Sequence, residues 1–599
     1  MGFSKPPFSS SLRVVLLASV IFFAGCGGDK QAVVGAAPQA GSAELEAHSA
    51  EFERAVVEVT DGIYVAIGYA LANSIMIVGD DGVIIVDTTE SKSSARLVKA
   101  EFDKITDKPV KAIIYTHNHT DHIFGAQVFA PDGGVPVYAH QSTWSHIVRI
   151  MNVLRPVIGV RSYHMFGSYL ESGGERIVND GIGPALAHSI DGAADEYGLI
   201  KPTHTFSDTL DITIAGRHLQ LIHSPGETDD QIVVWLPEER VLLPGDNVYK
   251  AFPNLYTIRG TRYRDVLKWS VTVGEMRELG AEFMVPSHTR PVSGAAEIDD
   301  ILGAYGDAIA YVHDQTVRGM NRGLDAQELA ETIQLPPHLA SHPWLQPFYG
   351  TVPWSVRSVY DGYLGWFDGN STSLFPTPKA QRAQRMVALS GGAESVLSAA
   401  QGSLAVDDPQ WAAELADLLL QAKASNTAQA KLLKAQALRA LARTTPNPNA
   451  RNWYLTDALE LEGKITIDLS GANAEVSAEQ AEFAKGFPIE GILNAMSVSL
   501  SPTASAGIDQ RVIFEFPDQD KRFLVHVRNR VAVVRKLGPA ADVTGPEAIV
   551  VSVNASDWVD LVTGQKSFPL ALANGTISVE GGLSDKGELL SFLQLFRAE

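Results

Sequence analysis

A histidine-rich segment directly after a short apolar run constrains this chain more than any other feature. Residues 110–115 have the pattern of a buried strand, and Thr116-His117-Asn118-His119-Thr120-Asp121-His122 follows them. In an extended loop His117 and His119 project to the same side, and a turn then brings Asp121 and His122 to a neighbouring position. Imidazole and carboxylate groups are zinc ligands, so the segment predicts a metal site with two adjacent subsites.

Composition narrows what such a site can be made of and what it can bind. Cys26 is the only cysteine among the 599 residues, so any intrachain disulfide or Cys-rich zinc module is excluded. The formal net charge is −21, which repels phosphate backbones and argues against nucleic acid as a partner. An anionic substrate therefore needs a local cationic or metal site.

The hydrophobic pattern divides the rest of the chain into three regions. Short apolar runs typical of buried strands occur at 73–78, 82–87, 110–115, 219–223, 231–235 and 240–243. With helical spacing over 91–105 between them, they predict a layered α/β domain. After about residue 295 amphipathic helices replace the strands, and the predicted helices are 301–318, 325–334, 354–364, 380–400, 409–425 and 427–443. A hairpin at 511–516 and 522–527 predicts a separate α+β domain at the end of the chain.

The N-terminal segment is typical of an export signal. Residues 14–24 form an apolar run that is too short to span a bilayer but suits a secretory signal. Phe23-Ala24-Gly25-Cys26 resembles a bacterial lipobox, which implies cleavage before Cys26 and lipidation of its thiol. An ordinary signal peptide cut elsewhere is the alternative. Gly27 favours an outer-membrane address, so we expect a lipoprotein facing the periplasm, with residues 27–50 as a flexible tether.

The histidine segment resembles the signature of the metallo-β-lactamase superfamily. The resemblance implies an αββα sandwich with further metal ligands in later loops. Glu227 stands where most members have a third histidine, Asp246 in Pro244-Gly245-Asp246 matches the bridging aspartate, and His288 matches the final histidine. By this resemblance two Zn²⁺ ions are bound, the first by His117, His119 and Glu227, the second by Asp121, His122 and His288, with Asp246 bridging. Asp121, Glu227 and Asp246 would then be the catalytic carboxylates.

A narrower resemblance points to the alkylsulfatase branch of that superfamily. It rests on Glu227 and on Asn254-Leu-Tyr-Thr-Ile-Arg259-Gly260. The chain departs from the branch at Asp246, where a glutamate is usual. The helical region resembles the dimerisation region of these enzymes, which implies a homodimer, and the tail resembles their sterol-carrier-like domain. The expected organisation is a signal peptide with lipobox (1–26), a tether (27–50), a catalytic domain (51–295), an all-α dimerisation domain (296–445) and an α+β sterol-carrier-like domain (446–599).

The resemblance implies zinc-dependent hydrolysis of an alkyl sulfate to an alcohol and inorganic sulfate by metal-activated water. The guanidinium of Arg259 and the amide of Asn254 suit a sulfate group. Tyr197 is a further candidate substrate contact, and a core or loop tyrosine is an equal interpretation. Two other functions stay open: a di-zinc hydrolase of a lactone, thioester or phosphoester, and a tethered lipid-binding protein with a degenerate enzyme domain.

Overall fold

The computed structural model describes residues 42–171, 173–185, 197–467, 478–538, 548–580 and 582–596. These residues form two compact units. The larger unit extends to Ile467, and the smaller one contains the chain after that point together with Ser145–Gly159. The predicted signal peptide, the lipobox at Cys26 and most of the predicted tether lie outside the described residues. None of the described helices is both long and apolar enough to cross a membrane.

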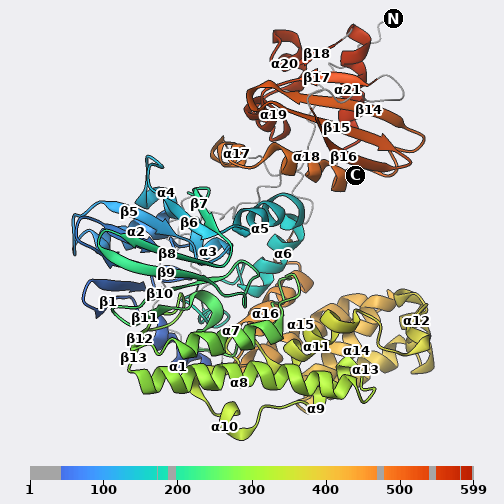
Figure 1. Cartoon of the computed structure of the whole chain (residues 1–599). Coiled ribbons are helices and arrows are strands. Elements are labelled where there is room, and N and C mark those ends of the chain that lie inside the picture. Colours follow the sequence, from blue (N-terminus) through green and yellow to red (C-terminus); the bar gives the residue numbers. More distant parts are fainter. Residues whose placement is uncertain are drawn as a thin grey trace, which may run out of the picture. The chain divides into compact units, whose positions relative to one another are not determined.

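Two β-sheets form the centre of the larger unit (Figure 1). The first sheet has seven strands in sequence order: β1 (Ala55–Thr60), β2 (Ile63–Ile67), β3 (Ser74–Val78), β4 (Val83–Val86), β5 (Val110–Ile114), β6 (Val137–His140) and β7 (His204–Phe206). The second sheet has the order β13 (Val292–Ser293), β12 (Phe283–Met284), β11 (Val241–Leu243), β10 (Ile232–Leu236), β9 (Arg217–His223) and β8 (Thr209–Ile214). The predicted runs at 73–78, 82–87, 110–115, 219–223, 231–235 and 240–243 therefore all contain strands.

The two sheets pack face to face and helices cover their outer faces. One apolar core joins side chains of both sheets, including Ile75 and Ile114 from the first and Leu221 and Val234 from the second. Helices α2 (Lys92–Phe102) and α4 (Ala126–Phe129) lie on the first sheet, and α7 (Val266–Glu278) and α8 (Ala295–Met320) pack on the second. This is the predicted αββα sandwich.

Helix α8, at which the helical region was predicted to start, packs on the sandwich as well as on the helices that follow it. Its buried stripe, including Ile301, Tyr305 and Ile309, packs in one core with Trp269 and Val273 of α7. The amphipathic pattern correctly predicted a helix here. It did not show which neighbour the apolar stripe contacts, because a stripe records only that one face is buried.

The helical region continues past the boundary predicted at 445. Its helices are α9 (Ala326–Thr332), α10 (Pro337–Ala340), α11 (Val352–Leu364), α12 (Lys379–Leu389), α13 (Ala393–Ala405), α14 (Pro409–Ala422), α15 (Thr427–Thr444) and α16 (Pro448–Leu461). The predicted helix 380–400 is two helices, because Gly391 and Gly392 both adopt positive φ angles between α12 and α13. The prolines around residue 446 mark only a turn, since Ala458 of α16 packs in one cluster with Leu438 of α15.

The segment directly before β1 is folded, although residues up to 50 were predicted to be a flexible tether. Helix α1 (Ala43–His48) begins at Ser42, whose side chain accepts a hydrogen bond from Leu45 N. Leu45 is fully buried among residues of the sandwich. A single leucine and a capping serine in an otherwise Ala- and Ser-rich stretch gave too weak a periodic signal to predict this helix.

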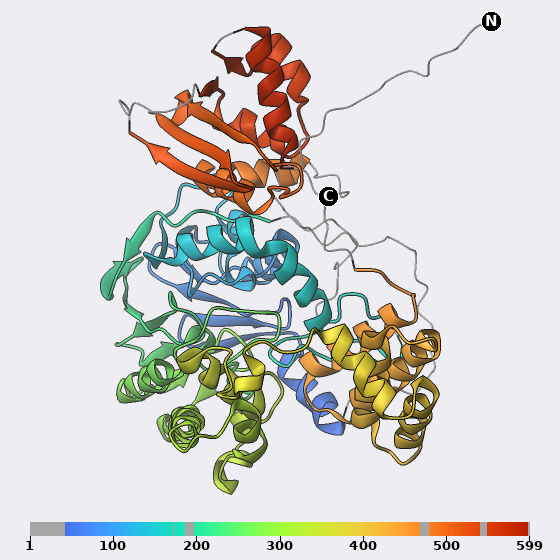
Figure 2. The same ribbon diagram turned by 90° about the vertical axis from the view of Figure 1, so that its right-hand side faces the viewer.

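The smaller unit contains a five-stranded sheet with helices on one face (Figure 2). The strand order is β16 (Val531–Leu537), β15 (Lys521–Arg528), β14 (Asp509–Phe516), β17 (Ile549–Ser552) and β18 (Ser578–Val579). The helices are α18 (Ile489–Val498), α19 (Ala555–Val562), α20 (Phe568–Asn574) and α21 (Leu583–Gln594), preceded by α17 (Ala478–Lys485). The predicted hairpin is β14 paired with β15, and the predicted α+β class is confirmed.

Candidate metal centre

The histidine segment lies in the loop between β5 and a short helix, α3 (Thr120–Ile123). His119 is the last extended residue, with φ −68° and ψ 149°, and the chain then turns into α3. The turn separates His117 and His119 from Asp121 and His122. One short segment therefore contributes side chains to two neighbouring positions, as its spacing predicts.

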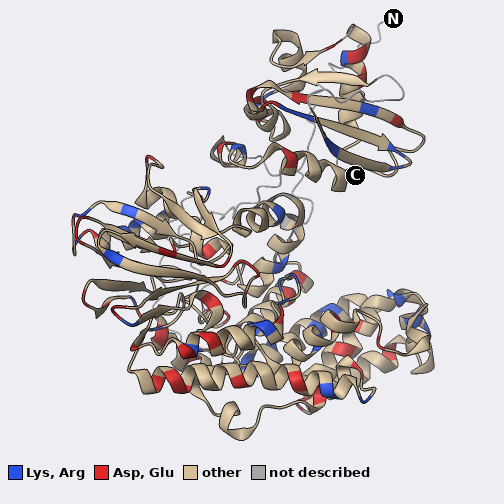
Figure 3. Cartoon of the chain, in the orientation of Figure 1, with Lys and Arg blue, Asp and Glu red and all other residues tan. Residues whose placement is uncertain are grey.

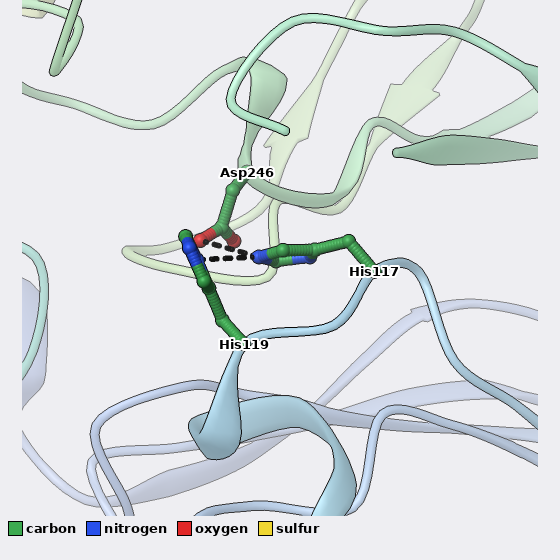
Figure 4. A group of neighbouring side chains, drawn as sticks. All are labelled: His117, His119 and Asp246. Atoms are coloured by element: carbon green, nitrogen blue, oxygen red, sulfur yellow. Dashed lines mark hydrogen bonds and ion pairs between the residues drawn. The ribbon is translucent and has the colours of Figure 1, made fainter. Parts of the chain in front are cut away.

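Six side chains gather into two groups whose donor atoms lie close enough to share a cation. The first group is His117, His119 and Asp246, and the second is Asp121, His122 and His288. In the first, His117 Nε2 lies 2.8 Å from His119 Nδ1, and the three side chains point toward one another (Figure 4). In the second, His288 Nε2 and His122 Nε2 lie 3.5 Å and 3.4 Å from Asp121 Oδ2.

Asp246 connects the two groups. Its Oδ2 lies 3.6 Å from His117 Nε2, 3.4 Å from His122 Nε2 and 3.2 Å from His288 Nε2. The residue follows β11 through Gly245, whose φ of +60° and contact with the Gln231 side chain leave no room for a Cβ. The position of Asp246 between the groups is the one that a bridging ligand requires.

Burial and neighbouring charges shift the pKa values of the two groups in different directions. Burial and the neighbouring His122 lower the pKa of His117 to about 3, so its ring is neutral at pH 7. Burial alone would lower the pKa of His122, but Asp246 and Asp121 raise it well above its usual value. Burial opposes ionisation of Asp121, yet His122 and His288 lower its pKa to about 2. The second group is therefore a region of strong negative potential that protons neutralise and that a metal ion would also neutralise.

The donor set fits a metal ion. His122 Nε2 and Asp246 Oδ1 are buried, and neither has a hydrogen-bond partner among the described residues. Buried polar atoms are ordinarily paired, so an unpaired donor atom in each of the two groups is consistent with a site for a cation. Nitrogen and carboxylate oxygen donors are those that Zn²⁺ and similar ions take. The residues thus support metal binding.

Glu227, predicted as a ligand of the first metal, lies outside both groups. Its Oε1 is 2.8 Å from Arg264 Nη1, and Tyr249 Oη lies 3.4 Å from its Oε2. Burial raises the pKa of Glu227 to about 7, while Arg264 and Arg259 act to lower it. Its role as a metal ligand stays a prediction. Arg264 was not predicted from the sequence, because an arginine outside the matched motif gives no signal of its own.

Asp87 is a second residue that the sequence did not single out. It follows β4, is fully buried and adopts a φ of 59°. Its Oδ2 lies 2.7 Å from His122 Nδ1 and accepts hydrogen bonds from Thr116 Oγ1 and Ser287 Oγ, both at 2.9 Å. A carboxylate on the far nitrogen of a ligating imidazole fixes the ring's orientation. Asp87 therefore fixes the position of the His122 loop relative to the His288 loop.

The three predicted substrate contacts differ in their surroundings. Arg259 is half-buried, and its Nη2 lies 3.4 Å from His119 Nε2, beside the first group. Asn254 is 1% exposed, and neither atom of its side-chain amide has a partner among the described residues. Tyr197 packs against Phe124, with ring centroids 4.4 Å apart, and that contact fits a packing role.

Comparisons with known proteins show the family to which the chain belongs. Three family models match: the metallo-beta-lactamase superfamily over residues 68–288, alkyl sulfatase dimerisation over 325–464 and the alkyl sulfatase C-terminal region over 477–599. A linear primary-alkylsulfatase from Pseudomonas sp. is 39% identical, with 88% of this chain and 98% of that protein covered. An (R)-specific secondary-alkylsulfatase from Pseudomonas sp. is 27% identical, with 90% of this chain and 80% of that protein covered.

The structural comparison covers nearly the same length. The solved structure of Pisa1, a stereoselective inverting sec-alkylsulfatase from Pseudomonas sp., superposes with a TM-score of 0.81 at 26% identity. The match covers 91% of this chain and 85% of that one. With the matching family models and the identity over most of both chains, the chain belongs to the alkylsulfatase family of the metallo-β-lactamase superfamily.

Proposed function

We propose that this protein is a zinc-dependent hydrolase that converts alkyl sulfate esters into an alcohol and inorganic sulfate. The observation that carries the proposal is the position of the Arg259 guanidinium beside the candidate metal centre. Arg259 reaches to 3.4 Å from His119, and the unpartnered amide of Asn254 is buried. A planar guanidinium and an amide donor together suit the tetrahedral oxygens of a sulfate.

The electrostatics of the chain support this role for Arg259. Acidic side chains occur throughout both units (Figure 3), and the formal net charge is −21. An alkyl sulfate is repelled by that field unless a local positive charge attracts it. Arg259 and a metal centre together supply the charge at the place where the ester must bind.

Zinc is the metal that we propose, with two ions per chain. Four histidines supply ring-nitrogen donors of the kind Zn²⁺ prefers, and the carboxylates of Asp121, Asp246 and Glu227 would offset much of the +4 charge. Bound zinc would supply a Lewis acid and lower the pKa of a water to about 7. The chain's own residues hold the reactants: Asp246 connects the two groups, while Arg259 and Asn254 orient the sulfate.

Purified protein assayed for sulfate release tests the activity. We expect inorganic sulfate and alcohol from dodecyl sulfate, and at most weak cleavage of lactones, thioesters and phosphoesters. Strong cleavage of one of these esters without sulfate release would replace the proposal with that activity. Tight lipid binding with less than one zinc per chain would replace it with a lipid carrier. Reaction in ¹⁸O-labelled water shows whether the new oxygen enters the alcohol or the sulfate.

We propose further that the helical region pairs two copies of the chain. Trp366 and Phe375 are 72% and 95% exposed, and Leu389 at the end of α12 is also exposed. Large apolar side chains exposed on a surface are typical of an interface between chains. Light scattering should give twice the chain mass for the wild type and a lower mass for Trp366→Glu combined with Phe375→Glu. Val531→Glu, at an exposed valine of the smaller unit, is the matched control and should leave the mass unchanged.

Anchoring through Cys26 is a proposal that rests on the sequence alone. If Cys26 carries lipid, the wild type expressed in a Gram-negative host should sediment with outer membranes and incorporate labelled palmitate. Cys26→Ser should lose the label and appear in the soluble fraction. Equal labelling of both proteins would contradict the anchor.

A further inference from the structure

We propose that helix α1, the first described element of the chain, positions the metal-ligand candidate His288. It does so by fixing the two backbone carbonyls that hold the far nitrogen of that imidazole. The inference rests on the proposed metal centre and adds to it a part of the chain that precedes the sandwich and contributes no ligand.

The orientation of His288 depends on Leu71 and Ile182. The Nδ1 atom of His288 lies 3.0 Å from Leu71 O and 3.1 Å from Ile182 O. Because a carbonyl oxygen only accepts, the proton must be on Nδ1. Nε2 is then directed at the carboxylate of Asp246, 3.2 Å away, and can bind a metal ion when it carries no proton.

Helix α1 and the residue after it fix the loop that carries Ile182. Asn179 Nδ2 donates to Leu45 O at 2.8 Å and to Ser49 Oγ at 2.9 Å. His48 Nε2 donates to Gly181 O at 2.7 Å. The Oδ1 of Asn179 accepts from Gly181 N at 2.9 Å, so the peptides beside Ile182 are held from both sides.

Packing extends the same restraint to Leu71. Leu45, Leu71 and Ile182 are buried in one apolar cluster, which also contains Phe348 and Tyr349. The ring of His48 stacks on Phe348, with centroids 4.1 Å apart and planes 15° apart. The backbone that faces Phe348 must be glycine, because a Cβ on Gly181 would lie 1.9 Å from Phe348 O. One short helix thus shares an apolar cluster with both residues whose carbonyls orient His288.

A positioning role and a merely stabilising role differ in what they do to the two metal subsites. His48→Phe keeps the ring on Phe348 but removes the donor to Gly181 O. Asn179→Ala cuts the link to Leu45 and Ser49 without changing α1. If α1 acts through His288, both variants should weaken zinc at the Asp121–His122–His288 subsite and leave the His117–His119 subsite unchanged.

The experiment is a competition titration of metal-free full-length protein with zinc against a chromophoric chelator. We expect two binding steps in the wild type. In both variants the zinc affinity of one step should fall about 10-fold while the other stays unchanged, since partners of ligating histidines typically contribute 10- to 100-fold. Excess zinc should restore kcat. Glu44→Gln, on the exposed side of α1, should bind zinc like the wild type.

Unchanged zinc affinity in both variants would overturn the proposal, and so would equal weakening of both steps with a matching fall in the stability of the metal-free protein. A wild type that binds two zinc ions but releases no sulfate would refute the proposed activity and leave the role of α1 standing. The two failures are therefore distinguishable.

Discussion

Arg264 Nη1 lies 2.8 Å from Glu227 Oε1, and the two side chains are each 2% exposed. Arg264 also donates to the backbone carbonyl of Asn254, while Tyr249 Oη accepts from Asn254 N at 2.8 Å. The backbone of the candidate sulfate-binding residue is thus connected on both sides to a carboxylate of the metal region. A substitution at Arg264 or Glu227 should therefore also affect the backbone of Asn254.

Removing the arginine should cost stability, because it leaves a buried carboxylate without its partner. We expect Arg264→Met to lower the free energy of unfolding by about 3–5 kcal/mol, the usual cost of breaking a buried ion pair. Urea denaturation measures the change. The control is Arg262→Met, which breaks the exposed 3.0 Å pair with Asp229 and should cost less than about 1 kcal/mol. Equal effects of the two substitutions would contradict the importance of burial here.

Asn254→Ala should separate activity from stability. The amide is buried but has no partner among the described residues, so its loss breaks no hydrogen bond within the described part of the chain. The melting temperature should stay the same or rise, whereas kcat/KM for dodecyl sulfate should fall about 10- to 100-fold, as expected for one hydrogen bond to a charged group. A variant that keeps full activity would exclude Asn254 from sulfate binding.

Asp87 should control metal affinity without contacting the metal. Asp87→Ala removes the acceptor of His122, Thr116 and Ser287 together, so we expect zinc affinity to fall about 10- to 100-fold. Chelator competition gives the value. Asp81→Ala, which removes the exposed partner of Lys111, is the matched control and should bind zinc normally. Loss of affinity in both variants would point to a general loss of structure.

The stability of the metal-free protein should depend on pH through Glu90. This carboxyl accepts a hydrogen bond from Leu71 N at 3.1 Å, and burial raises its pKa from 4.5 to about 7. Between these values the folded protein keeps a proton that the unfolded chain has released, so Glu90 destabilises the fold progressively as the pH rises. Glu90→Gln should gain stability relative to wild type from pH 4.5 upward, with the difference levelling off above about pH 7. A difference that is constant across this range in urea titrations would contradict the assignment.

The sandwich and its histidine loop are readable from the sequence because their signals are local. Short apolar runs bounded by turn residues correctly predicted the strands, and the spacing within residues 117–122 already implies two neighbouring positions. The function class also followed from short motifs, and relatives that match most of the chain support it.

The remaining parts depend on contacts between residues far apart in the chain. Asp87 has the pattern of a strand end, and nothing near it indicates that it bonds His122 and Ser287. The role of Arg264 depends on its ion pair with Glu227, which lies on a different loop. Helix α8 has a clear stripe, but the stripe does not say that its partner is α7. Long-range pairing of this kind is set by the tertiary fold and not by periodicity.

Stepwise reconstitution of the metal-free enzyme with zinc tests whether Asp246 joins two metal positions. Sulfate release from dodecyl sulfate is followed while zinc is added in counted equivalents per chain. We expect no activity without metal, a rise that ends at two equivalents, and no recovery in Asp246→Ala at the same zinc concentrations. Full sulfate release by the metal-free wild type, or full recovery in Asp246→Ala, would contradict a centre in which Asp246 joins two metal positions.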